Sequence, residues 1–224
     1  MKFTFATAEE GFDNHIENSV RGYSNLWNDI LKLSRYFVED DTNVVDIGCS
    51  TGKLIEKMYE QNKEYVPKAK YVGIEVEEDF FANLSSKKNI LCIKYIKEDI
   101  RNYKFENCNL ITSIFTLQFM SHRDRKEVIK NIYSGLNTGG GFIFSEKIIS
   151  EQPQIQEMLT FIYYDYKKNY FSEKEILDKE VQLRNMMKPN KLKELILMCE
   201  DAGFTCIQQF WQNFNFIAFI AIKR

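Results

Sequence analysis

Residues 44–52, Val-Val-Asp-Ile-Gly-Cys-Ser-Thr-Gly, decide the fold of this chain. A short β-branched run ends near Asp46, and two glycines, Gly48 and Gly52, lead into a helical pattern that begins near Lys53. A buried parallel strand, a tight turn and a helix N-terminus produce this pattern. The turn follows the carboxyl end of the strand, where open α/β sheets bind their ligands, so it predicts a nucleotide-type site.

Three kinds of glycine turn compete for this segment. The dinucleotide fingerprint needs Gly-x-Gly-x-x-Gly, which residues 48–52 do not supply, and a phosphate loop needs Gly-Lys-Ser/Thr, whereas Gly52-Lys53 is followed by Leu54. The segment resembles the third kind, the Asp-x-Gly-x-x-x-Gly turn of class I S-adenosylmethionine (SAM) methyltransferases. This resemblance implies SAM as the cofactor, and we expect no metal site because SAM carries no phosphates.

The bulk composition is that of one globular domain. The chain has 224 residues, of which 44% are hydrophobic and 14% aromatic. A net charge of −2 gives no electrostatic reason to expect direct binding of nucleic acid, and no apolar run reaches the length of a membrane span. The five cysteines lack metal-ligand spacing, and no signal peptide is evident at the N-terminus. We therefore expect a cytoplasmic protein.

Hydrophobic periodicity predicts alternating helices and strands, and hence an α/β fold. Helices are expected at 12–38 (divided at Gly22), 52–63, 78–86 and 123–135, with strands at 43–47, 71–74, 90–96, 110–117 and 142–144. Residues 154–202 follow as mostly helical, interrupted at 171–172 and Pro189, before two strands at 204–210 and 214–222. The sequence predicts a single domain, 1–224, with a Rossmann-like seven-stranded sheet, one antiparallel edge region, and helices at 1–40 that act as a lid.

The carboxyl ends of the predicted strands carry the candidate ligand groups. Glu75 ends the second strand and is placed to accept hydrogen bonds from both ribose hydroxyls. The alternative is that Glu75 is a surface side chain with no role in binding. Asp99 ends the third strand and is placed to bind the adenine amino group, or simply to cap a turn. Tyr23 lies between two N-terminal helical segments, where its ring is either a core side chain or a cation–π partner of the sulfonium.

Several motifs together resemble the carboxy-S-adenosyl-L-methionine (carboxy-SAM) synthase family. The resemblance implies a SAM-type fold and a homodimer in which helices of one subunit shape the other's pocket, with 150–202 as the cap and dimerisation segment. It also implies synthesis of the carboxymethyl donor used on a tRNA wobble uridine. The motifs are Gly22-Tyr23-Ser24-Asn25, Asp46-Ile47-Gly48-Cys49-Ser50, Phe115-Thr116-Leu117-Gln118-Phe119, Ser145-Glu146-Lys147 and Trp211 with Asn213-Phe214-Asn215-Phe216.

The resemblance transfers residue by residue to the cofactor site. Glu75 stands where the family usually has Asp, which preserves the ribose contact. Combined with the strand-end argument, this gives an expected set of cofactor-binding residues: Tyr23, Asp46, Gly48, Cys49, Ser50, Gly52, Glu75, Val76, Asp99, Ile100 and Phe115.

Two departures from the family pattern bear on the reaction. Ile114 replaces an Asn, and Glu180 replaces the Arg that grips the extra carboxylate of carboxy-SAM. A carboxylate facing a carboxylate in a partly dry pocket is repulsive by several kcal/mol. We therefore predict a SAM-dependent methyltransferase acting on a small molecule. The alternatives are a carboxy-SAM synthase that uses SAM and prephenate, and a non-catalytic SAM-binding partner protein.

The second substrate and any catalytic base are less defined by the sequence. Arg184 follows Glu180 at i+4; it either replaces the family arginine, binds the acceptor together with Glu180, or forms a surface pair with it. A base is needed only if the acceptor loses a proton, and the candidates are His122, Tyr164 and Asp165. Both His122 and the chain's other histidine, His15, are also compatible with purely structural positions.

Overall fold

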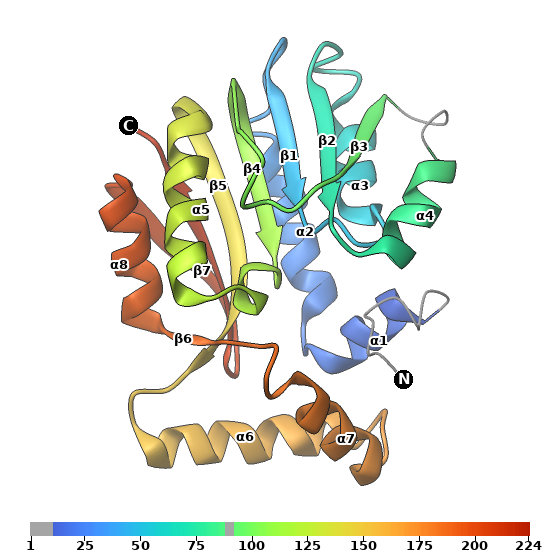
Figure 1. The fold of residues 1–224 in the computed structure, drawn as a ribbon, viewed down its shortest axis with the longest axis vertical. Coiled ribbons are helices and arrows are strands. Elements are labelled where there is room, and N and C mark those ends of the chain that lie inside the picture. Colours follow the sequence, from blue (N-terminus) through green and yellow to red (C-terminus); the bar gives the residue numbers. More distant parts are fainter. Residues whose placement is uncertain (1–10, 88–91) are drawn as a thin grey trace.

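A mixed β-sheet runs through the centre of the protein, which we describe from a computed structural model covering residues 11–87 and 92–224 (Figure 1). The strands lie in the order β3 (Ile93–Lys97), β2 (Lys70–Glu75), β1 (Asn43–Ile47), β4 (Cys108–Ile114), β5 (Leu136–Ile149), β8 (Phe216–Ile222) and β7 (Cys206–Asn213). The first five are parallel, whereas β8 runs antiparallel to both β5 and β7. This arrangement confirms the predicted fold, including its antiparallel edge.

Helices cover both faces of the sheet. Leu26 and Met58 pack with Val44 on one face, and Ile129 and Leu195 pack with Phe142 on the other. Consecutive strand residues such as Val44 and Val45 therefore enter opposite cores, as strand geometry requires. The helices are α1 (Phe12–Ser19), α2 (Tyr23–Ser34), α3 (Lys53–Asn62), α4 (Glu78–Ser86), α5 (His122–Gly135), α6 (Pro153–Lys167), α7 (Glu173–Leu183) and α8 (Leu192–Ala202).

The insertion between β5 and α8 places two helices beyond the ends of the strands. Figure 1 shows α6 and α7 lying below the lower ends of the sheet, with α1 beside them. Ser172 begins α7 with the predicted capping box, in which its backbone N–H donates to Glu175 at 2.8 Å. Gly203 ends α8 with a φ of 117°, as its sequence position predicts.

The predicted ends of several strands were wrong. The strand expected at 110–117 ends at Ile114, because Phe115 turns away with a φ of 55° and Leu117–Phe119 form a short 3₁₀ helix. The glycines at 139–141 lie inside β5 rather than before it. Gly141 has a packing reason to be in the strand, since a Cβ there would lie 2.8 Å from the ring of Phe37. The start of the strand expected at 90–96 lies outside the described residues.

One strand was not predicted. Asn190–Lys191 form β6, which pairs in parallel with Ile148 and Ile149 of β5. A strand of two residues is too short to show an alternating pattern. No helix in the described ranges is long and apolar enough to cross a membrane.

Candidate functional site

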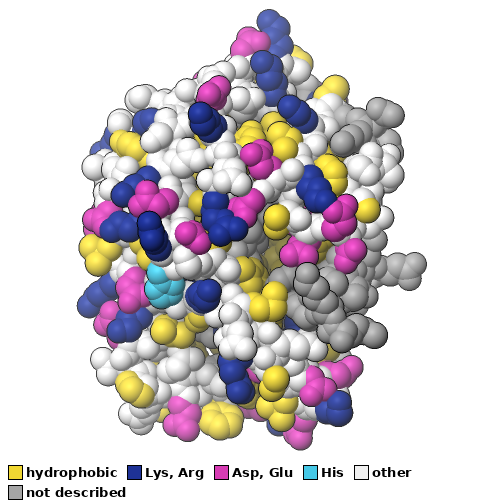
Figure 2. Space-filling view, in the orientation of Figure 1, with side chains coloured by type: hydrophobic (Ala, Val, Ile, Leu, Met, Phe, Trp, Pro, Cys, Tyr) yellow, Lys and Arg dark blue, Asp and Glu magenta, His cyan; other side chains and the backbone are white. Residues whose placement is uncertain are grey.

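A cavity of about 990 Å³ opens at the carboxyl ends of β1, β2 and β4. Side chains of α1 and α7 close it from the other side. The space-filling view in Figure 2 shows hydrophobic side chains inside a hollow near the centre of this face. The cavity thus lies where parallel α/β sheets bind ligands, and at the edge that the sequence predicts.

The glycine turn forms the floor of one end of the cavity. Gly48 has a φ of 65°, and a Cβ there would lie 2.5 Å from the side chain of Thr116, so only glycine fits without a shift of its neighbours. The backbone N–H groups of Gly48 and Cys49 both donate to the carbonyl of Ile74, at 2.8 and 3.1 Å. The turn is therefore fixed against β2, with Gly48 and Ser50 lining the cavity.

Glu75 anchors this turn from the end of β2. Its carboxylate accepts hydrogen bonds from the backbone N–H groups of Ser50 at 2.9 Å, Val76 at 2.8 Å and Glu77 at 2.9 Å. Only 5% of the residue is exposed, and burial raises the pKa of Glu75 while the three backbone donors oppose that rise. A carboxylate offers about four acceptor positions, so room for a further donor remains.

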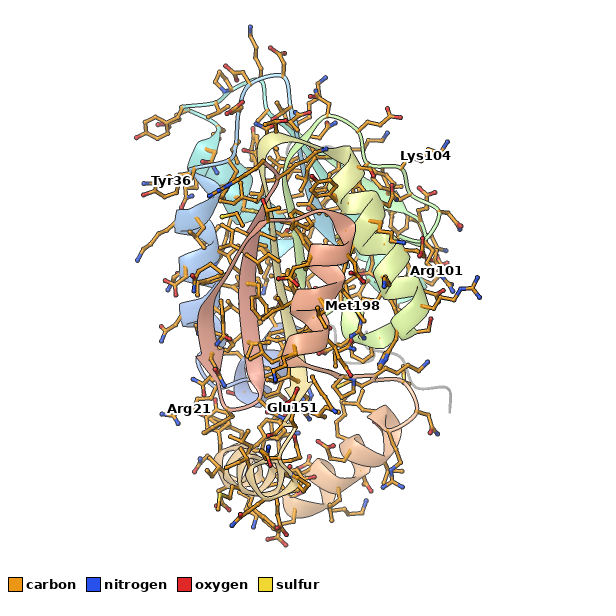
Figure 3. All side chains as sticks on the ribbon, turned by 90° about the vertical axis from the view of Figure 1, so that its left-hand side faces the viewer. Arg21, Tyr36, Arg101, Lys104, Glu151 and Met198 are labelled. Atoms are coloured by element: carbon orange, nitrogen blue, oxygen red, sulfur yellow. The ribbon has the colours of Figure 1, made fainter. Side chains whose placement is uncertain are left out.

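Asp99 lies across the cavity with a cationic partner that the sequence analysis did not consider. The side-chain Nε of Arg101 donates to both carboxylate oxygens of Asp99, at 2.9 and 3.0 Å, and this pairing lowers the pKa of Asp99. Arg101 also approaches Asp124 at 3.5 Å and is half exposed. Figure 3 labels it at the periphery of the molecule. Asp99 and its neighbour Ile100 both line the cavity.

Aromatic rings form a continuous wall along the cavity. The centroid of Tyr23 lies 6.2 Å from that of Phe115, which lies 5.6 Å from Phe216, and Phe216 lies 5.3 Å from Tyr163. All four residues line the cavity. The wall begins beside the glycine turn and ends among the side chains of α6.

Beyond this wall lies a group of lysines that the sequence analysis missed. The lysine cluster consists of Lys147, Lys167 and Lys179, which line the cavity together with Glu180 and His15. The Nζ of Lys147 lies 3.9 Å from a carboxylate oxygen of Glu180 and 4.9 Å from the ring centroid of Tyr163. The three lysines come from one strand and two helices, β5, α6 and α7, so no local spacing could reveal the cluster.

Burial changes the ionisation of these side chains. It lowers the pKa of Lys167 to about 8, with Lys147 and Lys179 adding to the effect and Glu180 opposing it. Burial also lowers the pKa of Lys147 and of Lys179. His15 has a pKa lowered to about 4 by burial and by the nearby charges of Lys179 and Lys167, so its imidazole is neutral at pH 7.

Glu180 does not act as an unpaired negative charge at this end of the cavity. The Nζ of Lys147 lies 3.9 Å from the Glu180 carboxylate, and its attraction offsets the repulsion that the sequence predicts toward a bound carboxylate. Arg184 lines a smaller neighbouring cavity of about 330 Å³ and is absent from the lining of the larger one. Glu180 therefore lines both cavities, whereas Arg184 lines only the smaller one.

Several other candidates lie outside the large cavity. Asp46 is buried beneath the turn, where Thr112 donates to it at 2.7 Å and burial raises the pKa of Asp46 to about 7. Cys49 is also buried, beside Gly73, and Gly52 begins α3 with a φ of 79°. These three shape the turn but do not line the cavity. Val76 does line it.

The three candidate bases also lie outside the large cavity. His122 and Asp165 are exposed and line neither of the two cavities. Tyr164 lines only the smaller one. Adjacency in sequence to cavity residues was thus a poor guide, because alternate helix positions point to different sides.

A buried arginine holds the segments that carry the lysine end. Arg125, on α5, is fully buried and donates from Nε to the carbonyl of Leu117 at 2.9 Å and from Nη2 to that of Lys188 at 2.7 Å. It also contacts Asn190 and lies 4.0 Å from the buried carboxylate of Glu146. The next residue after Leu117, Gln118, accepts a hydrogen bond from the backbone N–H of Lys147 at 2.8 Å. The sequence around Arg125 predicts only a helix and gives no sign of this network.

The residues of the cavity fit SAM. A glycine turn that a Cβ would fill, a strand-end carboxylate with spare acceptor capacity and an aromatic wall are suited to an adenosyl sulfonium. Fold and site together define a SAM-dependent enzyme of the class I methyltransferase type. Residues 44–140 match a family model described as a methyltransferase domain, which confirms the predicted enzyme class and cofactor.

The chain belongs to the carboxy-S-adenosyl-L-methionine synthase family, as its motifs predicted. It is 39% identical over 220 residues to the carboxy-S-adenosyl-L-methionine synthase of Staphylococcus epidermidis, covering 97% of this chain and 94% of that protein. The enzyme of the same name from Histophilus somni is 31% identical over 227 residues, covering 99% and 93%.

Solved structures show the same fold at low sequence identity. A magnesium protoporphyrin IX methyltransferase from Synechocystis PCC 6803, with bound SAH, aligns with a TM-score of 0.63 and 12% identity over 93% of this chain and 87% of its own. Human N-acetylserotonin methyltransferase in complex with SAM aligns with a TM-score of 0.58 and 13% identity, over 88% and 51%.

Proposed function

We propose that this SAM-dependent enzyme acts on a small molecule that carries a carboxylate. The lysine cluster supports this most directly, because its three amino groups outnumber the one carboxylate of Glu180 at the end of the cavity away from the glycine turn. A carboxylate in such a partly buried site gains charge-assisted hydrogen bonds. When bound, SAM supplies an electrophilic methyl group at a sulfonium centre.

In the same proposal, the cofactor is held by residues at the strand ends. Glu75 takes a ribose hydroxyl with its remaining acceptor capacity, and the backbone of Gly48 and Ser50 lies against the amino acid portion. Tyr23 and Phe115 face the sulfonium. Asp99 reaches the adenine amino group beside its pair with Arg101.

Two reactions are compatible with SAM and a carboxylate-bearing small molecule as the two substrates. The names of the full-length relatives, at 31–39% identity, favour formation of carboxy-SAM, and the lysine cluster removes the electrostatic objection that Glu180 raised. Methyl transfer to a carboxylate-bearing acceptor is the second, and the replacement of the family asparagine by Ile114 favours it. The two reactions differ in whether the second substrate gains a methyl group or SAM gains a carboxylate.

The mass of the nucleoside product separates these reactions. Purified protein is incubated with SAM and prephenate, or with SAM and a set of small carboxylic acids, and the nucleosides are analysed by mass spectrometry. A species heavier than SAM by one carboxylate identifies carboxy-SAM formation, whereas S-adenosylhomocysteine together with a methylated acid identifies methyl transfer. Lys179→Met should lower the affinity for the second substrate by about 10-fold, because one charged contact is lost, and should leave the affinity for SAM unchanged. If neither product forms, the proposal is refuted.

We also propose that the chain forms a homodimer through the outer faces of α6 and α7. Ile155, Met158 and Ile162 recur at helical spacing on α6 and are about half exposed, beside the exposed Phe161. On α7, Leu177 and Val181 are also exposed at i and i+4. Apolar side chains gathered in this way are typical of a protein–protein interface.

Dimerisation is tested by a charge in this face. Phe161→Asp places a carboxylate among apolar side chains and should shift the protein from dimer to monomer, measured by size-exclusion chromatography with light scattering at about 10 μM. Tyr36→Asp, at a residue 81% exposed on another part of the surface, is the matched control and should stay dimeric. A wild-type protein that runs as a monomer would contradict the proposal.

Residues 1–40 and 150–202 supply the lid and the cap in this proposal. In the described part of the lid, Asp13 accepts a hydrogen bond from Thr51 at 3.0 Å and pairs with Lys53, and Phe12 packs against Phe80 at 4.9 Å. These contacts support α1 as a flap over the cofactor end. Five free cysteines, three of them buried, support a reducing location such as the cytoplasm.

A further inference from the structure

Lys167 differs from the other members of the lysine cluster in its position. It is the last residue of α6, only 3% of it is exposed, and it lines the large cavity. Its Nζ lies 5.3 Å from the ring centroid of Tyr163 and 5.6 Å from that of Phe171. Tyr163 is also the last ring of the aromatic wall, so Lys167 lies at the junction between the wall and the second-substrate end.

The charged groups around Lys167 favour loss of its proton. Lys147 from β5 and Lys179 from α7 both repel a third ammonium, and burial adds a desolvation cost. Glu180 is the opposing carboxylate, and its oxygen lies 3.9 Å from the Nζ of Lys147. From α1, His15 contributes a neutral ring. A lysine in these surroundings exists partly as a neutral amine near pH 8.

Other titratable groups at this end of the cavity are poor proton acceptors. His15, with a pKa near 4, is a weak base, and the carboxylate of Glu180 is paired with Lys147 at 3.9 Å. The phenol of Tyr163 has its pKa raised by burial and therefore stays protonated. Carboxy-SAM formation releases a proton from the methyl group, and methyl transfer releases one inside the cavity when the acceptor is an O–H or N–H group.

We propose that Lys167 is the group that accepts a proton at the second-substrate end of the cavity. This inference rests on the proposed function. In methyl transfer, its neutral Nζ takes the acceptor's O–H or N–H proton while the acceptor's lone pair bonds to the methyl carbon and the carbon–sulfur pair stays on sulfur. In carboxy-SAM formation, it takes the proton that leaves the methyl carbon, whose electron pair bonds to carbon dioxide. The carbon dioxide leaves prephenate as its carbon–carboxyl bond breaks, the electron pair of that bond enters the ring and expels the ring hydroxyl as hydroxide, and the hydroxide takes up the proton to form water.

Lys167→Arg tests the proposal because arginine keeps the charge but does not release its proton. We expect kcat with SAM and prephenate to fall at least about 100-fold, the usual size of a general base effect. Wild-type kcat should rise with pH through about 8, as Lys167 loses its proton, and this rise should vanish in the variant. Calorimetry should show SAM affinity within about 3-fold of wild type.

Lys168→Arg is the matched control, since Lys168 is the next residue and pairs with Glu173 on the surface at 3.1 Å. It should keep both the rate and the pH profile. A Lys167→Arg variant that retains more than a tenth of the wild-type kcat with an unchanged pH profile would overturn the proposal.

A second measurement does not depend on turnover. In protein labelled with [ε-¹³C]lysine, the signal missing from Lys167→Arg, or from Lys167→Ala if the arginine variant does not fold, belongs to Lys167. Its titration near pH 8 supports the proposal, and titration above pH 10 overturns it. If wild type binds SAM but makes neither product, the proposed function fails while this titration still tests Lys167.

Discussion

Replacing Arg125 with leucine is expected to lower the free energy of unfolding by about 3–5 kcal/mol at pH 7, the range for removing one partner of a buried charged network. The guanidinium is fully buried, and its loss leaves the carbonyls of Leu117 and Lys188 without their donor. It also leaves the carboxyl of Glu146 without its cation. Urea unfolding followed by circular dichroism measures the change.

The pH dependence gives this prediction a second readout. Burial raises the pKa of Glu146 to about 8, and Arg125 opposes that rise, so removing Arg125 raises it further. A folded-state pKa above the unfolded value means stability that is lost as pH rises through the folded pKa. The destabilisation relative to wild type should therefore grow above pH 8.

Two variants bracket this expectation. Arg123→Leu, at an exposed position on the same helix, should change stability by less than about 0.5 kcal/mol. Glu146→Leu added to Arg125→Leu should recover part of the loss, because it removes the uncompensated carboxyl. A cost below about 1 kcal/mol for Arg125→Leu alone would show that the network contributes little.

Glu75→Ala is expected to weaken SAM binding by about 100-fold, close to the upper range for a hydrogen bond to a charged group. The carboxylate serves both the proposed ribose contact and the turn, through its bonds to Ser50, Val76 and Glu77. Isothermal titration calorimetry gives the affinity, and thermal unfolding without ligand shows how much of the effect comes from the turn.

The neighbouring glutamate supplies the control for Glu75. Glu78 begins α4 and has a side chain 70% exposed, paired with Lys97. Glu78→Ala should leave SAM affinity within about 2-fold of wild type, since surface pairs contribute little. Equal affinity of Glu75→Ala and wild type would remove Glu75 from the binding site.

Local pattern was enough to predict the sheet and the cofactor end of the cavity. The β-branched run at 44–47, the glycine turn and the strand-end position of Glu75 are all encoded within about thirty residues, and the parallel topology brings them together. The strand ends that were misplaced have tertiary causes. Phe115 leaves its strand to reach Tyr23 and Phe216, and Gly141 sits under Phe37.

The second-substrate end could not be predicted in the same way. Lys147, Lys167 and Lys179 are separated by intervals without a common period, and only the packing of α6 and α7 over the strand ends gathers them. The same lack of long-range information made Glu180 look unpaired, although Lys147 lies beside it. The motifs were enough to identify the family, but they did not reveal the charged side chains near Glu180.

The two ends of the cavity are built from different kinds of segment. Strand termini and the glycine turn form one end, while the insertion between β5 and α8 contributes most of the other. Substitutions in that insertion can alter which acid enters without disturbing the strands that carry the nucleoside. Exchange of this segment between relatives is therefore a way for evolution or protein engineering to change the second substrate while the sheet stays the same.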